Sequence, residues 1–346
     1  MTNFIALILL SVEVFLLFTR SMDLTVVTEL NLCLNYTCEY AHKTTVTVLL
    51  NACVTAVIIL TVCGNLLVII SISHFKQLHT PTNFLILSLA TADMMVGVTV
   101  MPLQFITKTL CWHMSTTLCY FSLLCSTHFT FVSIYNVTLI SLDRFYALSN
   151  PFQYSNNITL KVTSVLICLN WFVSLCYNLF FIYLNVTGNG DVVCFGECPV
   201  VVNETWAVTD LFVTFVIPCS VMIILYTKIF AIARKHAKNI NITRNHECAP
   251  KASERKAATT LGILVIVFVA CLLPYFLSVV FSDSIPGTLL MQLLEGTVLV
   301  LYLNSAINPI IYALFYPWFR KCSKLILMLK IFNPDSSLVD VLTRSG

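Results

Sequence analysis

Charged side chains are scarce in this sequence: only 10% of its 346 residues are Asp, Glu, Lys or Arg, against about 25% in soluble domains. Glycine and proline are also few, with 9 and 11 residues, which excludes fibrous and low-complexity chains. No repeat of about 20–50 residues is present, which excludes solenoids and propellers. Because 58% of the side chains are apolar, soluble enzymes and nucleic-acid binders are excluded, and apolar surface is expected to face lipid.

Seven apolar stretches are each long enough for the roughly 20 residues that a helix needs to cross a membrane. A helix is the only open-chain structure that satisfies its own backbone in lipid. The sequence therefore predicts an all-α membrane protein, with a seven-transmembrane helix bundle over 46–315 and a short amphipathic cytosolic helix and tail over 316–346. The stretches cover roughly 46–73, 82–106, 116–146, 161–184, 206–233, 257–281 and 289–315.

Lysine and arginine are distributed unevenly between the two sides. Of the 19 basic residues, only Arg20, Lys43 and Lys108 fall on the side of the N-terminus. By the positive-inside rule, the N-terminus is extracellular and the C-terminus is cytosolic, in a multi-pass protein of the plasma membrane. Residues 1–45 then form an extracellular segment, in which 1–21 are a cleaved signal or an upstream extension rather than a stable helix.

Exterior cysteines and glycosylation sequons agree with this orientation. Disulfides are expected on the oxidising side, where Cys119 and Cys198 form the expected pair and Cys33 or Cys38 would pair with Cys194. The sequons at Asn35, Asn185 and Asn203 lie in exterior segments and are predicted glycosylation sites. No cysteine has metal-site spacing with histidines, so no metal site is predicted. Cys322, in the basic amphipathic stretch, is either a palmitoylation site or an unmodified cysteine.

Ionisable groups inside the spans are costly and point to function. Asp93, the pair Asp143-Arg144, and Asp210 are such groups. The alternative is a polar group buried against a neighbouring helix for packing alone. A transporter or channel would show internal repeats or rings of charge, which are absent from this sequence. An intramembrane enzyme would need a nucleophile and base or a metal, yet His128 has no evident partner, so no enzyme is predicted.

One short motif in each span carries a family resemblance. The order and number of these motifs resemble class A (rhodopsin-like) G protein-coupled receptors from Val46 to Phe332. The segment from Asn304 to Phe319 is similar to the fingerprint of trace amine-associated receptors. The motifs are Asn65, Leu89-Ala90-Thr91-Ala92-Asp93, Asp143-Arg144-Phe145, Trp171, Pro218, Phe268 with Cys271 and Pro274, and Asn308-Pro309-Ile310-Ile311-Tyr312.

The resemblance implies a G protein switch and a sodium site. In the switch, Arg144 next to Asp143 would bridge to Glu254 at rest, although Glu254 is equally a charged residue favoured at a helix start. Tyr226 and Tyr312 resemble tyrosines that approach Arg144 in the active state. The sodium set is Asp93, Ser133, Asn304 and Asn308, which a water cluster would also explain. No cofactor is expected beyond this allosteric sodium ion.

The ligand pocket departs from the usual aminergic pattern. The family's amine-binding aspartate lies eighteen residues, or about five helical turns, before Arg144, and that position is Ser126. Asp210, eight residues before Pro218, would replace it, as in a fish branch of the trace amine-associated receptors. No basic residue of the neighbouring spans is available to pair with it, so its expected partner is a ligand ammonium. The other predicted pocket residues are Thr127, Thr130, Tyr275, Phe276 and Tyr302.

These features predict an olfactory receptor for amines that signals through a stimulatory G protein and cAMP. Its expected partners are a small amine, a heterotrimeric G protein and membrane lipid, without nucleic acid. Two alternatives stay open: a non-olfactory biogenic-amine receptor, and a receptor for a ligand that is not an amine. Leu272 stands where the family has a tryptophan switch, which changes how the pocket is coupled to span six. Glu295 is either a second cation site or a solvated charge at the rim.

Overall fold

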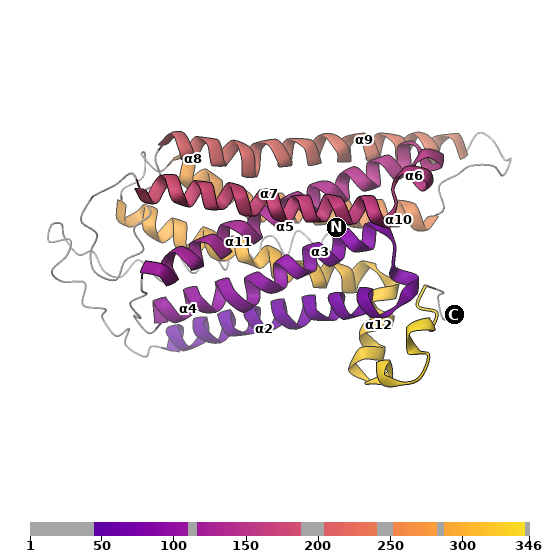
Figure 1. The fold of residues 1–346 in the computed structure, drawn as a ribbon, viewed down its shortest axis with the longest axis horizontal. Helices are drawn as coiled ribbons and strands as arrows, with labels where there is room; N and C mark the ends of the chain where they lie inside the picture. Colours follow the sequence, from indigo (N-terminus) through magenta and orange to yellow (C-terminus); the bar gives the residue numbers. More distant parts are fainter. Residues whose placement is uncertain (1–44, 110–115, 188–203, 241–251, 282–286, 343–346) are drawn as a thin grey trace.

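The computed structural model describes residues 45–109, 116–187, 204–240, 252–281 and 287–342. Within these residues, seven helical stretches are long and apolar enough to cross a membrane, and they lie side by side in one bundle (Figure 1). The predicted seven-helix fold is confirmed. In chain order the spans are α2 (Thr45–His74); α3 (Pro81–Met95), η2 (Val96–Val100) and α4 (Met101–Thr109); α5 (Thr116–Ser149); α7 (Leu160–Thr187); α8 (Glu204–Asp210), η3 (Leu211–Val216) and α9 (Ile217–Ile240); α10 (Ala252–Val280); and α11 (Gly287–Phe315).

The third span, α5, is the centre of the bundle, because it packs against α3, α7, α9 and α10. The apolar core lies around the C-terminal half of α5 and includes Ile134, Met222, Phe268 and Tyr312. Helices held this closely in lipid need polar or small-residue contacts, since lipid tails are as apolar as leucine. The bundle therefore depends on interhelical hydrogen bonds as well as on packing.

The fourth span, α7, shows this dependence most clearly, since much of its apolar surface is exposed. Trp171 Nε1 donates to Ser88 Oγ on α3 at 3.0 Å, and Asn170 Nδ2 donates to the Val132 carbonyl on α5 at 3.2 Å. In hydrocarbon, such bonds contribute about 1 kcal/mol each. They orient α7, so that its inner face is turned toward the pocket.

Shorter helices gather at one end of the bundle, where α6 and α12 are seen in Figure 1. Proline opens both α6 and α12, at the helix position where a missing N–H costs nothing. The α6 helix lies between the third and fourth spans, where the hydropathy pattern indicates only a polar connection. The short elements are η1 (Lys76–Leu78), α6 (Pro151–Asn157), α12 (Pro317–Leu327), η5 (Lys330–Phe332) and η6 (Ser336–Leu338).

The α12 helix follows span seven directly and is amphipathic, as the sequence predicts. Its inner face buries Trp318, Phe319, Cys322 and Ile326. Cys322 is 0% exposed, and burial raises the pKa of its thiol to about 12. Because palmitoylation requires an accessible thiolate, this geometry favours the unmodified cysteine.

Candidate functional site

Asp210 lies where span five changes from an α-helix to a π-helix. It is the last residue of α8, and η3 begins at the next position. At the end of η3 the Ile217 N–H bonds to the Phe212 carbonyl, five residues back. The widened turn rotates the side chains that follow it about the helix axis. Such turns are frequent at functional sites. The Val213 carbonyl accepts a hydrogen bond from the Tyr135 hydroxyl on α5 at 2.9 Å, which holds this segment toward the third span.

The Asp210 carboxylate contacts Tyr177 of α7, which belongs to a cluster of aromatic side chains from α5 and α7. The Tyr177 hydroxyl donates to Asp210 Oδ1 at 3.1 Å. The ring of Phe131 stacks on Tyr135 with centroids 4.5 Å apart and lies 5.4 Å from the ring of Tyr177. Within the part of the chain that the structure describes, no cationic side chain pairs with Asp210. Among the described residues, the carboxylate therefore accepts a hydrogen bond from Tyr177 and has no cationic partner.

Ser126 occupies the position where the resemblance expects an aspartate, and it contacts span seven. Its Oγ lies 3.1 Å from the Tyr302 hydroxyl, and the Tyr302 side chain is buried. Thr127 turns its hydroxyl back to the Leu123 carbonyl of its own helix at 3.0 Å. The structure thus brings Ser126 and Tyr302 together as a neutral pair, while Thr127 is bonded within α5.

Span six contributes the aromatic residues that follow Pro274. Phe276 is buried and stacks on Phe215 of η3 with ring centroids 4.6 Å apart, and Tyr275 lies edge-on to Phe276 at 5.2 Å. Span six therefore touches the π-helical segment of span five just after Asp210. Leu272 is also buried, and it lines a small cavity with Thr130 below this contact.

Asp93 is fully buried in α3 and accepts three side-chain hydrogen bonds. Ser133 Oγ and Ser305 Oγ donate to its Oδ1 at 2.8 and 2.9 Å, and Asn308 Nδ2 donates to its Oδ2 at 2.6 Å. Ser133 and Asn308 were expected from the sequence. Ser305 was not, and Asn304 of the predicted sodium set is not among the three donors. One residue along a helix rotates a side chain by about 100°, enough to turn Asn304 away from the carboxylate.

Asn304 instead lines the small cavity beside this cluster, together with Ser133 and Ser305. The cavity measures about 10 Å³, which is about the room of one water molecule. Asn304 Oδ1 is buried and accepts no hydrogen bond from the residues that the structure describes. An unpaired acceptor next to a buried carboxylate is the kind of oxygen-rich lining that a hard cation prefers.

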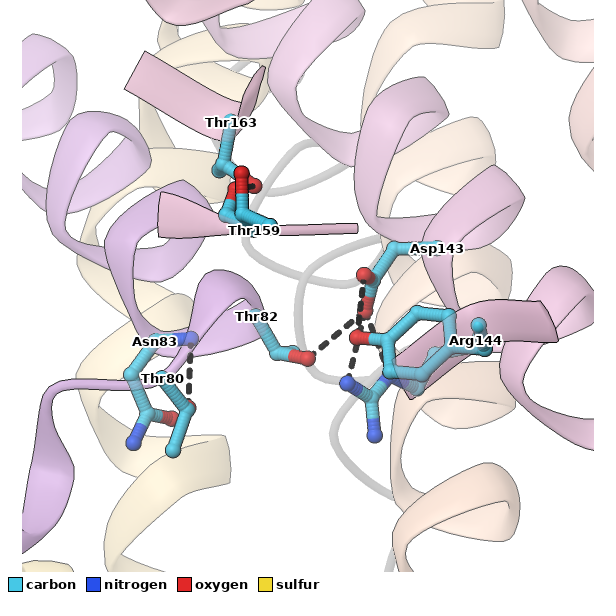
Figure 2. Close-up of polar contacts among 8 residues, drawn as sticks. Thr80, Thr82, Asn83, Asp143, Arg144, Thr159 and Thr163 are labelled. Atoms are coloured by element: carbon cyan, nitrogen blue, oxygen red, sulfur yellow. Dashed lines mark hydrogen bonds and ion pairs between the residues drawn. The ribbon is translucent and has the colours of Figure 1, made fainter. Parts of the chain in front are cut away.

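Arg144 at the foot of span three is held by its neighbour Asp143 (Figure 2). Arg144 Nε and Nη2 donate to Asp143 Oδ2 at 3.0 and 2.6 Å, and the Thr82 hydroxyl donates to the same oxygen at 2.6 Å. The Tyr154 hydroxyl of α6 donates to Oδ1 at 2.7 Å. Burial and the Asp143 carboxylate raise the pKa of Tyr154, so this phenol stays protonated and donating.

Two tyrosines of the predicted switch carry unsatisfied hydroxyl groups. The Tyr226 and Tyr312 hydroxyls are buried and form no hydrogen bond with the described residues. Buried polar groups without partners are uncommon in folded proteins. Tyr312 packs edge-on against Tyr316, with ring centroids 6.0 Å apart. In this arrangement neither hydroxyl is hydrogen-bonded to Arg144, which is consistent with a resting state.

Several predicted residues lie outside the described part of the structure. Cys119 is disulfide-bonded, but its expected partner Cys198 is not described, and neither are Cys38 and Cys194. The pairings stay predictions. The helix α10 includes position 254, but the side chain of Glu254 is outside the description, so its bridge to Arg144 is untested. Among the predicted glycosylation sites, Asn185 lies near the end of α7 with its side chain outside the description, and Asn35 and Asn203 are not described. These sites stay predictions.

Four contact residues were missed by reasoning from the sequence: Thr82, Tyr154, Tyr177 and Ser305. Each is an uncharged side chain, so the cost of burying a charge does not single it out. The sequence signals are weak: Tyr177 is one of 13 tyrosines, and Ser305 is next to the residue that was chosen. Only the packing of the helices brings these hydroxyls to the carboxylates of Asp143, Asp210 and Asp93.

Comparisons with known proteins agree with this geometry. Residues 64–312 match the family model of the 7 transmembrane receptor (rhodopsin family). The chain is 40% identical over 325 residues to trace amine-associated receptor 13c of Danio rerio, covering 90% of this chain and 94% of that protein. The chain belongs to the trace amine-associated receptors. Trace amine-associated receptor 6 of Homo sapiens is 40% identical over 298 residues, covering 82% of this chain and 86% of that protein.

Membership of this receptor family defines the general activity of the chain. The chain is a G protein-coupled receptor, a multi-pass membrane protein that transmits a signal, and it is not an enzyme. Its partners are a small-molecule ligand and a G protein. The switch residues Asp143 and Arg144 lie at the same end of the bundle as α6 and α12, opposite to Asp210 along the helices. The predicted ligand residue and the predicted switch residues therefore lie at opposite ends of the bundle.

Proposed function

We propose that this receptor detects amines and binds their ammonium group at the Asp210 carboxylate. The observation that carries the proposal is the missing counter-ion: among the described residues, Asp210 receives one phenolic hydrogen bond from Tyr177 and no cationic contact. A carboxylate inside a membrane span is costly unless it is paired. A ligand ammonium would supply the positive charge that none of the described residues provides to Asp210.

The surroundings of Asp210 favour an organic cation over a metal ion. Tyr177 contacts the carboxylate and packs against Phe131, which stacks on Tyr135, and aromatic faces attract ammonium groups. Ser126 and Tyr302 form a neutral hydroxyl pair across the bundle, so a second charge is not offered there. The pocket therefore suits an amine with one cationic end held at span five.

The finer role of the receptor follows from the same family. We propose that it is an olfactory receptor of the plasma membrane, with an extracellular N-terminus, and that it raises cAMP through a stimulatory G protein. The distribution of basic residues supports the orientation. The alternatives are a biogenic-amine receptor outside the olfactory system and a receptor for a ligand that is not an amine.

A cAMP assay with Asp210→Asn tests the proposal. Cells expressing the wild type or the variant are exposed to primary, tertiary and diamines. Losing one partner of a buried charge pair costs about 2–5 kcal/mol, so the half-maximal concentration should rise at least about 30-fold. Asparagine keeps the size of the side chain and can still accept the hydrogen bond of Tyr177, so the variant isolates the charge.

Asp335→Asn is the matched control, because Asp335 is an exposed carboxylate of the cytosolic tail. Surface labelling of all three proteins separates lost binding from lost expression. Equal responses of the wild type and Asp210→Asn would contradict the proposal and direct attention to Glu295. A well-expressed wild type that no amine activates would support the alternative of a different ligand.

The switch we infer uses the contacts around Arg144. At rest the guanidinium is paired with Asp143, while the Tyr226 and Tyr312 hydroxyls lack partners. Release of Arg144 would allow these hydroxyls to form the hydrogen bonds that they lack, and a movement of span six would open the cytosolic cleft for the G protein. Because Phe276 of span six stacks on η3 next to Asp210, ligand binding at span five reaches span six through that contact.

We also propose that sodium binds beside Asp93. Asn304 Oδ1 is an unpaired buried oxygen that lines the small cavity with Ser133 and Ser305, and hard cations take oxygen ligands. Bound sodium would supply positive charge to the Asp93 carboxylate. The two serine hydroxyls would have to turn, so that their oxygens face the ion rather than their protons facing Asp93. Asn308 would keep its bond to Asp93 Oδ2.

Sodium dependence of amine potency tests this site. Replacing sodium by N-methylglucamine at constant ionic strength should change the half-maximal amine concentration by about 5- to 150-fold, the usual range of allosteric coupling. Asn304→Ala should remove most of this dependence, while Asn170→Ala, at a buried asparagine that does not line the cavity, should keep it. A sodium effect that survives unchanged in Asn304→Ala would overturn the assignment.

A further inference from the structure

The chain turns back after α12 and docks on the short turn between spans one and two. There η6, near the C-terminus, packs against η1. The return begins at Leu329, whose φ of 56° lies in the left-handed region and is uncommon for a bulky side chain. Such a backbone persists only where the surrounding structure holds it in place. We term residues 336–342, which follow this return, the tail clamp.

Two side chains of the tail clamp are buried, although their neighbours are exposed. Ser336 is 9% exposed and Val341 is 2% exposed. Leu338 and Val339, which lie between them, are 58% and 40% exposed. Val341 belongs to the main apolar core of the bundle. A tail that only passed over the surface would not bury single side chains in this pattern, so the clamp is docked at two points.

Ser336 joins the clamp to the end of span one. Its hydroxyl donates to the Ile331 carbonyl at 2.6 Å. A serine hydroxyl has one proton, so its oxygen is left to accept from His74 Nε2, 3.0 Å away. His74 is the last residue of α2. A directional hydrogen bond therefore links span one to the clamp, with the His74 proton on Nε2.

The second docking point joins the clamp to η1 and to α12. The Val341 N–H donates to Gln77 Oε1 of η1 at 3.1 Å. On the other side, Lys321 Nζ of α12 donates to the Asp340 carbonyl at 2.6 Å. Both bonds use backbone groups of the clamp, so they depend on the path of the chain. The clamp thus holds η1 against α12.

The turn η1 leads directly into the first turn of α3, which carries Thr82 (Figure 2). Leu78, the last residue of η1, is fully buried, and its carbonyl accepts from Asn83 Nδ2 at 2.8 Å. Thr80 caps α3 by accepting from the Asn83 N–H at 3.3 Å. Thr82 in the same turn donates to Asp143 at 2.6 Å. Coupling travels through such connected contacts, so the position of η1 affects how Thr82 meets Asp143.

We propose that the tail clamp is an autoinhibitory contact that holds the receptor in its resting state. When it is docked, it fixes η1 and keeps Thr82 bonded to the carboxylate that pairs with Arg144. When it is released, η1 can shift, Asp143 loses the Thr82 hydrogen bond, and Arg144 is freed more easily. The two states differ in the burial of Val341 and in the hydrogen bonds to α2 and η1. The inference rests on the Arg144 switch proposed for this receptor and requires no ligand.

Val341→Ser tests the clamp, and Val339→Ser is the matched control. The two variants make the same change at a buried and at an exposed position. Burial of a valine side chain changes an equilibrium constant about tenfold. In the full-length receptor, protection of the clamp amides against hydrogen–deuterium exchange should therefore fall about tenfold in Val341→Ser. It should stay as in the wild type in Val339→Ser.

Basal GTPγS binding reports whether the clamp restrains the switch. It should rise in Val341→Ser by up to about tenfold, because the clamp can shift the switch no further than its own equilibrium changes. Gln77→Ala disturbs the same contact from the exposed side chain of η1 and should act in the same direction. This second variant keeps the proposal testable if Val341→Ser does not reach the cell surface.

Thr82→Val tests the route from the clamp to the switch. It should raise basal activity by itself, and adding Val341→Ser should raise it no further, because both changes remove the same contact. Additive effects would contradict the route through α3 and with it the proposal. Lost protection with unchanged basal activity in Val341→Ser would overturn it too, since the clamp would then be structural only.

Two other results would also count against the clamp. Equal protection in the two valine variants would show that Val341 does not dock the tail. Unchanged basal activity in Val341→Ser, together with a rise in Asp143→Ala, would overturn the clamp and leave the Arg144 switch in place. If neither variant changes basal activity, the switch itself fails and the clamp fails with it.

Discussion

Replacing Asp143 by alanine is expected to raise basal activity several-fold and to destabilise the receptor. Asp143 accepts hydrogen bonds from Arg144, Thr82 and Tyr154, so alanine removes the anchor of three elements at once. The Asp143 side chain is 5% exposed and that of Arg144 is 23% exposed. Breaking a buried pair leaves an uncompensated charge and costs about 3–5 kcal/mol; the partial exposure of Arg144 puts the expected value at the low end.

Basal GTPγS binding and thermal unfolding of the solubilised receptor measure the two effects. Tyr154→Phe is the graded control: it removes one neutral donor and leaves the ion pair, so it should cost about 1 kcal/mol and change basal activity little. Asp143→Asn removes the charge at constant size and should resemble alanine in basal activity. If Asp143→Ala leaves both measurements unchanged, Arg144 is held by another group, for which Glu254 is the candidate.

Adding a methyl group at Gly64 is expected to remove most of the receptor from the cell surface. A Cβ atom at Gly64 would lie 2.8 Å from Cβ and 2.9 Å from Cγ of Pro309, closer than carbon atoms can approach. The proline ring is rigid and cannot turn away, so α2 and α11 would have to separate. The Asn65 Nδ2 bond to the Ser305 carbonyl, 3.0 Å long in the same contact, would be lost with it. Overpacking of this kind costs about 1–3 kcal/mol or more.

Gly262→Ala is the matched control for Gly64→Ala, since both add one methyl group to a glycine in a span. At Gly262 the nearest atom is the Cζ of Phe230 at 3.3 Å, the outer end of a side chain that can rotate. Flow cytometry of an epitope-tagged receptor should show near wild-type surface levels for Gly262→Ala and several-fold lower levels for Gly64→Ala. Similar levels for the two variants would contradict the close contact of α2 and α11.

The predicted functional residues differ from their contact partners in how clearly the sequence identifies them. Asp93, Asp143 and Asp210 were found because a carboxylate in a span is rare and expensive, a property that is local to the sequence. Their partners Ser305, Thr82 and Tyr177 are common residues in such helices, and nothing in the sequence distinguishes them from their neighbours. Asn304, predicted as a sodium ligand, lines the small cavity with Ser133 and Ser305, and its role stays a prediction.

The helix α6 and the π-helical segments η2 and η3 also could not be predicted from the sequence. A seven-residue helix between spans has too few residues for a clear apolar period, and Tyr154 reaches Asp143 only because α6 forms. The π-helical turn after Asp210 adds a residue to one turn, which cannot be read from a pattern that assumes 3.6 residues per turn. The direction of every side chain beyond it depends on that insertion.

The sequence by itself determined the number of spans, their approximate limits and the receptor family, and it predicts their orientation. These follow from the thickness of the hydrocarbon layer, the need to satisfy the backbone in lipid, and motifs that are local in the chain. The tertiary structure decided which side chains meet: Tyr177 with Asp210, Ser305 with Asp93, and Ser336 with His74. These contacts depend on how each helix is rotated and how closely two helices approach, which only the packing of the whole bundle defines.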